Sequence, residues 1–146
     1  MRKVFADSSI IIAGAASRKG ASRAVLMMAE IGLFQLIISE QVVTECQRNL
    51  SKKLPAALPV FTELLTQMNL EILPDPPLSE SNRWDTIIEA KDAPILAAAF
   101  LAKVDRLLSL NTKDFTQEVA VKSGLNIQTP AQFIQEIREL VAEGLL

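Results

Sequence analysis

Four acidic side chains occupy positions from which a folded chain could present them to a common site. Asp7 directly follows the apolar run 4–6, and Asp114 follows the apolar stretch of LLSLNTKDF. Asp92 opens the alanine-rich segment KDAPILAAA, and Glu45 lies within SEQVVTEC. An unpaired charge inside an apolar interior is costly. These residues therefore either cap local turns or serve a functional site.

The composition limits the chemistry that such a site could perform. The chain has no histidine and no tyrosine, which excludes histidine proton shuttles, Ser-His-Asp triads and histidine-rich zinc sites. Two carboxylates ~5 Å apart repel by about 3 kcal/mol at an effective dielectric constant of roughly 20, and a divalent cation would remove that conflict. Carboxylate oxygens are the ligands that Mg²⁺ and Mn²⁺ prefer. A metal held in this way can lower the pKa of a bound water and neutralise charge on a phosphoryl group.

Each acidic residue also has a purely structural interpretation. Asp92 precedes Pro94 by two residues, a spacing typical of a helix N-cap. Asp7 could form an Asx-turn onto Ser9, Asp114 could cap a short turn, and Glu45 could be an exposed helix residue. Taken singly, Asp92 and Glu45 favour these structural roles. Taken together, the placement of the acids at strand ends and helix starts favours a shared site.

The elements that would position these residues alternate along the chain. Continuously apolar strands between helices are typical of a parallel sheet covered on both faces, and ligands of such sheets bind at the carboxyl ends of the strands. The expected strands are 3–6, 34–39, 69–73, 105–110 and 126–128. The expected helices are 21–33, a helix N-capped by Ser39, 55–68, 83–90, 93–102 and a last helix from Pro130, with a loop over 74–81.

Length and charge set further bounds. The 146 residues correspond to one domain, and the net charge of −2 gives no global signal for nucleic-acid binding. Two basic clusters stand out, Arg18, Lys19 and Arg23 in one and Arg48, Lys52 and Lys53 in the other, and solvated helix ends are their ordinary interpretation. The lone cysteine and the lack of a membrane-length apolar stretch predict a cytoplasmic protein without membrane contact.

Four segments in order resemble the PIN-domain nucleases. FADSSI resembles the opening strand of that family, which ends in Asp followed by small hydroxyl residues. SEQVVTEC resembles its glutamate segment, KDAPILAAA its Asp-initiated alanine-rich helix, and LLSLNTKDF its strand that leads to an acidic residue before Phe. Together the segments extend over most of the chain.

This resemblance implies a fold, an activity and a set of site residues. The fold would be a three-layer α/β/α sandwich with a central parallel sheet of four to five strands, formed by residues 1–146 as a single PIN-like domain. The activity would be that of a ribonuclease dependent on Mg²⁺ or Mn²⁺. The implied catalytic residues are Asp7, Glu45, Asp92 and Asp114, of which Asp7, Asp92 and Asp114 would bind metal. Ser8, Ser109 and Asn111 would support them, with Asn111 also open as the fourth site position; Ser9 departs from the Asn common in the family.

Many PIN-domain proteins of this length are similar to the VapC toxins of toxin–antitoxin pairs. The resemblance therefore implies an RNA substrate, a small antitoxin protein as partner and a homodimer. The alternative is a non-catalytic binding module of the same fold, whose carboxylates hold a structural ion or none.

Overall fold

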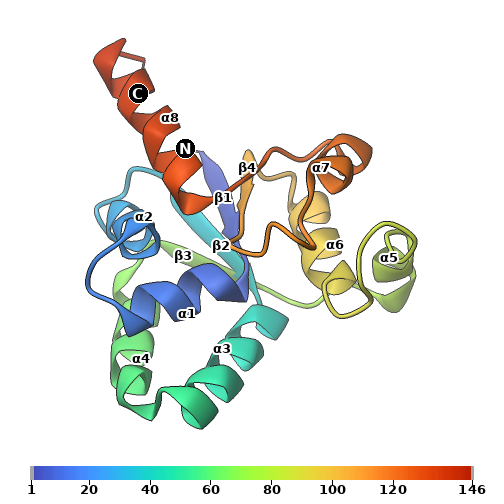
Figure 1. Cartoon of the computed structure of the whole chain (residues 1–146), viewed down its shortest axis with the longest axis horizontal. Helices are drawn as coiled ribbons and strands as arrows, with labels where there is room; N and C mark the ends of the chain where they lie inside the picture. The colour runs from blue at the N-terminus through green and yellow to red at the C-terminus, as the bar shows by residue number, and fades with distance from the viewer. Residues whose placement is uncertain (1, 146) are drawn as a thin grey trace.

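A five-stranded parallel sheet forms the centre of the molecule. The computed structural model describes residues 2–145. Its strands are β1 (Lys3–Ala6), β2 (Gln35–Ser39), β3 (Leu70–Leu73), β4 (Arg106–Leu108) and β5 (Ile127–Gln128). All pair in parallel in the order β3-β2-β1-β4-β5 (Figure 1), which confirms the predicted central sheet.

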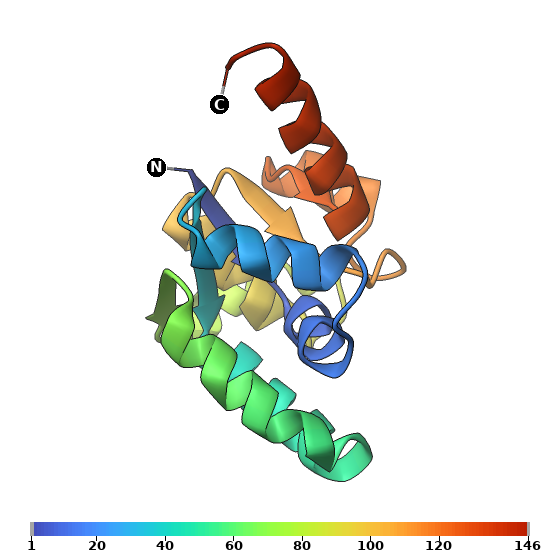
Figure 2. The ribbon, with the colours of Figure 1, turned by 90° about the vertical axis from the view of Figure 1, so that its left-hand side faces the viewer.

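Helices cover both faces of this sheet. They are α1 (Ser8–Ala16), α2 (Ala21–Glu30), α3 (Glu40–Lys53), the 3₁₀ turn η1 (Pro55–Ala57), α4 (Leu58–Gln67), α5 (Leu78–Asn82), α6 (Ala93–Ala102), α7 (Gln117–Ser123) and α8 (Pro130–Ala142). Right-handed crossovers put the helices between β1 and β3 on one face and those between β3 and β5 on the other. In agreement, α1 packs against α2, α3 and α4, whereas α5 packs against α6. Figure 2 shows α2 in front of the strands and α6 behind them. The result is the predicted three-layer arrangement.

The central strands are apolar along their length because both of their faces are covered. Phe5, Leu36 and Leu107 are fully buried or nearly so. Helix α6 is buried on most sides, from Ala93 to Ala99, as expected for a helix without a polar face. The last helix, α8, packs against α2 and is joined to the start of β2 by an edge-to-face contact of Phe133 with Phe34, with ring centroids 5.3 Å apart.

The segment between β3 and α6 differs from the sequence prediction. A helix was expected over 83–90 after a loop over 74–81, but the helix is α5, which begins directly after Pro77, and turns occupy 83–92. The apolar spacing around Trp84 reflects tertiary packing rather than a helix. The Trp84 ring lies 5.0 Å from that of Phe100 on α6, and this contact overrides the weak local propensity.

Candidate metal and active site

The candidate site lies at the carboxyl ends of β1 and β4. These strands are neighbours, with Ala6 opposite Leu108. From β1 the chain crosses one face of the sheet to β2, whereas from β4 it crosses the other face to β5. Such a switch point is where ligands bind in parallel α/β sheets. The backbone N–H of Asp7 donates to the Leu108 carbonyl at 3.1 Å, so Asp7 and Ser109 follow the two strands side by side.

Asp7 is buried and receives hydrogen bonds on both carboxylate oxygens. It N-caps α1, with the Ser9 N–H donating to Oδ1 at 3.1 Å and the Ser9 hydroxyl donating to the same atom. The Ser109 hydroxyl donates to Oδ2 at 2.5 Å. Burial raises the pKa of Asp7, and the hydrogen bonds from Ser109 and Ser9 act in the opposite direction. The Asx-turn considered from the sequence is present, and the same carboxylate joins the ends of two strands.

Ser109 starts a chain of hydrogen bonds that leads to Asp114. Strand β4 ends at Leu108, earlier than predicted, so Ser109 lies in the loop. Its hydroxyl accepts from the Asn111 N–H at 2.9 Å. The Asn111 side chain donates to Asp114 Oδ2 at 2.9 Å and accepts from the Asp114 N–H at 3.2 Å. The hydrogen bond from Asn111 is the main cause that lowers the pKa of Asp114, so this carboxylate is held in its charged form.

Asp92 contributes a buried carboxylate that the protein leaves incompletely paired. It occupies the N-cap position of α6 but makes no side-chain capping hydrogen bond, so the capping interpretation of this residue is wrong. The residue is 7 % exposed, and its Oδ2 atom has no hydrogen-bond partner among the described residues. Burial raises the pKa of Asp92 to about 7, and the nearby carboxylate of Asp114 adds to the shift. The fold therefore places a buried carboxylate with a raised pKa next to one with a lowered pKa.

A third carboxylate completes this group. Oxygens of Glu89, Asp92 and Asp114 all lie within 4.8 Å of one another. Glu89 is exposed and lies in the turns before α6, which are pinned to that helix by the contact of Trp84 with Phe100. Sequence reasoning missed Glu89 because it fell inside an expected helix. Its spacing of three residues from Asp92 was the available signal.

Glu45 approaches the site from α3. The Ser39 hydroxyl caps this helix by accepting from the Val42 N–H at 3.4 Å, as predicted. Glu45 is half-buried beside Ser8 and Gln41, and its Oε1 atom has no partner within the described chain. Burial is the main cause that raises the pKa of Glu45, and the charge of Asp7 adds to it.

Gln41 ties α3 to the segment that carries Asp92. Its side-chain amide donates to the Lys91 carbonyl at 3.0 Å, and its backbone N–H donates to Asp75 Oδ1 at 2.9 Å. The charge of Glu45 in turn contributes to the raised pKa of Asp92. The four predicted acids therefore lie within one electrostatic neighbourhood.

Within that neighbourhood, the close group of three contains Asp92 and Asp114 but not Asp7. Asp7 is connected to it through Ser109 and Asn111. Ser8 lies against Glu45 rather than against Asp7. The hydroxyl missed as a supporting group is that of Ser9, which binds Asp7 and accepts from the Leu110 N–H at 3.0 Å.

The family model of the PIN domain matches residues 3–113. The chain belongs to the PIN-domain family. Its fold is similar to VapBC from Salmonella typhimurium bound to DNA, with 17 % identity, a TM-score of 0.67 and coverage of 89 % of this chain and 99 % of that chain. It is also similar to VapBC2 from Rickettsia felis bound to DNA, with 18 % identity, a TM-score of 0.66 and coverage of 87 % of this chain and 98 % of that chain. A third similar structure is PAE2754 from Pyrobaculum aerophilum, with 20 % identity, a TM-score of 0.64 and coverage of 92 % of this chain and 96 % of that chain. No curated protein matches the chain.

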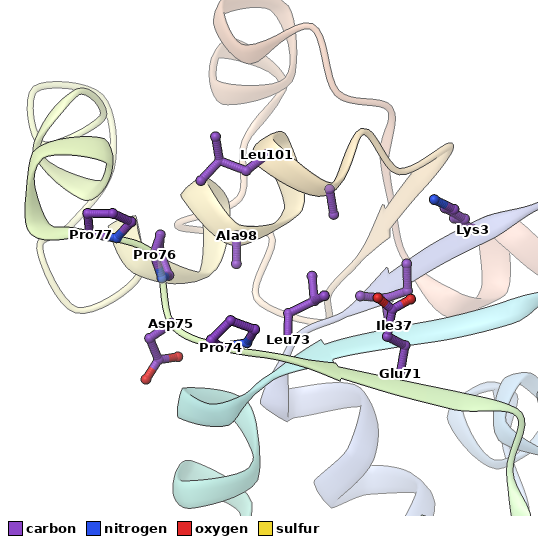
Figure 3. Close-up of a pocket in the computed structure, with 11 residues that line it drawn as sticks. Lys3, Ile37, Glu71, Leu73, Pro74, Asp75, Pro76, Pro77, Ala98 and Leu101 are labelled. Carbon is purple, nitrogen blue, oxygen red and sulfur yellow. The ribbon is translucent and has the colours of Figure 1, made fainter.

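The PIN-domain chain also has a hollow of about 330 Å³ that is separate from the acidic residues. It lies over β2 and β3 beside α6 (Figure 3). Its wall includes Leu73, Pro76 and Leu101, with Lys3 and Glu71 at one end. None of the four predicted acids lines it, so the carboxylates at the carboxyl ends of β1 and β4 remain the candidate site.

Proposed function

We propose that this PIN-domain chain is a cytoplasmic, divalent-metal-dependent endoribonuclease and the toxin of a toxin–antitoxin pair. One observation carries the enzymatic part of the proposal. Two buried carboxylate oxygens, Asp92 Oδ2 and Glu45 Oε1, have no partner within the described chain, and both belong to acids gathered at the switch point of the sheet. Buried polar atoms are nearly always satisfied, so these two await a ligand.

The residues present fit Mg²⁺ or Mn²⁺. The donor set consists of carboxylate oxygens without histidine or thiolate, the ligand chemistry of hard cations. Asp92, Asp114 and Glu89 would hold the ion, with Asp7 as a further ligand. The pKa of Asp92 is raised first by burial and then by the nearby carboxylate of Asp114, and a bound cation would offset both effects. When bound, such a cation lowers the pKa of water and neutralises charge on a phosphoryl group.

The chain's own residues would then have distinct tasks. Hydrolysis of RNA adds water across the bond between phosphorus and O3′, so the site must accept a proton from the attacking water. Glu45 lies outside the group of three, and its pKa is raised by burial, which suits it to take that proton at Oε1. Ser109 and Asn111 would act through Asp7 and Asp114, because their hydrogen bonds orient these carboxylates.

The assignment as a toxin rests on the structural neighbours. They include VapBC complexes from Rickettsia felis, Salmonella typhimurium and Haemophilus influenzae and a sarcin-ricin loop cleaving toxin from Mycobacterium tuberculosis at 11 % identity and a TM-score of 0.57. By analogy, this chain would be a homodimer that binds a small antitoxin protein. Among residues 2–145, no helix has the length and apolar character needed to cross a membrane.

Cleavage of a mixed RNA pool tests the enzymatic proposal. The purified protein is assayed with Mn²⁺, with Mg²⁺ and with excess EDTA, beside Asp92→Asn. Asp85→Asn is the matched control, because Asp85 is an exposed aspartate in the same run of turns but outside the acidic group. We expect metal-dependent cutting by the wild type and Asp85→Asn, and a loss of 100-fold or more in Asp92→Asn, the order expected when several kcal/mol of metal stabilisation is lost. Equal cutting by Asp92→Asn, or cutting in EDTA, would contradict the proposal and favour the binding module.

A further inference from the structure

The second basic cluster of the sequence lies beside the candidate site. Arg48, Lys52 and Lys53 are exposed on α3, three, seven and eight residues after Glu45. In a helix these spacings bring side chains to the same side as Glu45. The helix that delivers an acid to the site therefore carries a row of cations leading away from it.

A hollow of about 320 Å³ joins the two kinds of charge. One end is formed by Ser8 and Glu45, which belong to the site, and the far end is cationic. Ile12 of α1 supplies an apolar wall. The hollow is lined by Ser8, Ile12, Glu45, Arg48, Asn49, Lys52 and Lys53.

The cations of this hollow are not engaged in ion pairs. The four ion pairs found among residues 2–145 involve none of Arg48, Lys52 and Lys53. Lys52 and Lys53 lie in the last turn of α3, where they favour the helix dipole. That role does not account for Arg48, which lies before the last turn and beside Asn49 in the same wall.

We propose that this hollow is the track for the phosphate backbone of single-stranded RNA next to the cleaved bond. The proposal rests on the proposed nuclease function and adds where its substrate lies. Glu45 and Lys52 are separated by about 10 Å along the helix axis at about 1.5 Å per residue, which about three nucleotides of a stacked strand cover at about 3.4 Å each. Arg48, Lys52 and Lys53 bind successive phosphates, and Asn49 donates a further hydrogen bond from its amide.

Charge explains why such a track is needed. The chain has a net charge of −2, and the site itself is built from carboxylates, so the protein as a whole does not attract RNA. A local row of cations supplies that attraction and carries no information about base sequence. No aromatic residue lines the hollow, so bases have no stacking platform there. The residues of α3 would therefore recognise the phosphate backbone of the RNA and not its base sequence.

Salt-dependent RNA binding tests the track. Anisotropy of a fluorescein-labelled single-stranded 12-mer is measured in EDTA over a range of NaCl concentrations, for the wild type, Arg48→Gln, Lys52→Gln and the double variant. Lys122→Gln is the control for removal of a helix-terminal charge. Lys122 pairs with Glu118, but it is an exposed lysine in the last turn of α7, which lies far from α3 in Figure 1. We expect the slope of log K against log salt to fall by about 0.7 for each side chain removed, with affinity reduced equally for RNAs of different sequence.

Cleavage assays with metal separate this proposal from the proposed function. Arg48→Gln and Lys52→Gln should raise KM more than they lower kcat, whereas Lys122→Gln should behave as wild type. If the wild type cuts RNA but both variants match Lys122→Gln in slope and KM, the track is overturned and the nuclease stands. If the wild type does not cut but the slopes fall as expected, the track stands as a binding surface and the nuclease is overturned. Absence of both binding and cutting overturns both. Thermal melting checks that each exposed-site variant is folded.

Discussion

Two buried aspartates begin helices at the same edge of the sheet, and the protein treats them in opposite ways. Asp7 begins α1 and receives hydrogen bonds from Ser9 and Ser109 on its two oxygens. Asp92 precedes α6, makes no capping hydrogen bond, and leaves Oδ2 without a partner among the described residues. Their exposed fractions are similar, 4 % and 7 %. Burial alone therefore does not determine whether the fold itself satisfies the hydrogen-bonding atoms of a carboxylate.

The difference lies in what each carboxylate does for the fold. Asp7 connects the end of β1 to that of β4 and caps α1, so it stabilises the native structure even without metal. Oxygens of Asp92, Glu89 and Asp114 lie within 4.8 Å of one another. The burial of Asp92 beside the carboxylate of Asp114 costs stability, and the proposed cation would offset that cost. The carboxylate at the start of α1 therefore stabilises the strand ends that form the site. At the start of α6, the proposed cation should change stability most.

Metal binding should give the largest effect. At 100 times its Kd, Mn²⁺ should stabilise the wild type by about 2.7 kcal/mol, a rise in Tm of about 8 °C for a chain of this size. Asp92→Asn should lose most of this rise, because one of the three convergent carboxylates is gone, and Asp85→Asn should keep it. Differential scanning fluorimetry in Mn²⁺ and in EDTA measures both. An equal rise in Asp92→Asn would place the ion elsewhere.

Removal of the Asp7 carboxylate at the start of α1 should have the next largest effect on stability, and this effect should be present in the absence of metal. Asp7→Ala should lower the free energy of unfolding by about 2 kcal/mol, because the cap is lost and the hydroxyl of Ser109 loses its acceptor. Asp7→Asn keeps a capping oxygen and should lose less. Urea unfolding in EDTA gives the values. Wild-type stability of Asp7→Ala would show that the hydrogen bonds at α1 are not structural.

The pH dependence of stability should reveal the acid at α6. Burial raises the pKa of Asp92 from its ordinary value of 3.8 to about 7 in the fold, so the folded state binds this proton more tightly than the unfolded state. The stability it contributes is present below pH 3.8 and is lost as pH rises toward 7.

The Asp92→Asn variant should not lose stability in this way as the pH rises, because an amide does not titrate. In EDTA at pH 8 we expect it to be more stable than wild type by on the order of 1 kcal/mol, below the full linkage value because water screens the cluster at exposed Glu89, and no more stable at pH 4. Urea unfolding from pH 4 to pH 8 tests this, with Asp85→Asn as the control. If the free energy of unfolding changed with pH in the same way in the wild type and in Asp92→Asn, charged Asp92 would not destabilise the fold, and Asp92 would not differ from Asp7 in this respect.

The smallest effect should come from the residue that links the two regions. Asn111→Ala removes the hydrogen bond to the half-buried Asp114 and should cost about 0.5 kcal/mol. Because that hydrogen bond is the main cause that lowers the pKa of Asp114, the pKa should rise in the variant. Carboxyl titration by NMR measures the shift. An unchanged pKa would mean that Asn111 does not support Asp114.

Several residues of the candidate site can be predicted from the sequence. Asp7 could be placed at a strand end because short apolar runs predict strands, and Ser39 could be placed at an N-cap because it precedes a helical pattern. Ser109 was expected inside the strand 105–110, which in the structure ends at Leu108. The roles of the two aspartates could not be assigned, since a capping hydrogen bond depends on a backbone geometry that Asp92 does not adopt, with φ −98° and ψ −16°. Glu89 was not assigned either, because the sequence predicted a helix over 83–90, where the structure has no helix and Trp84 packs on α6.

By itself, the sequence determined the parallel sheet and a set of acids without histidine, but it did not predict helices α1, α5 and α7. These properties follow from local patterns: apolar runs, helical spacing and residue type. Only the tertiary structure decided that Glu89 joins Asp92 and Asp114, that Asp7 is held by Ser109, and that the cations of α3 share a hollow with Glu45. These outcomes depend on how crossovers and side-chain packing bring distant segments together, which no local pattern encodes.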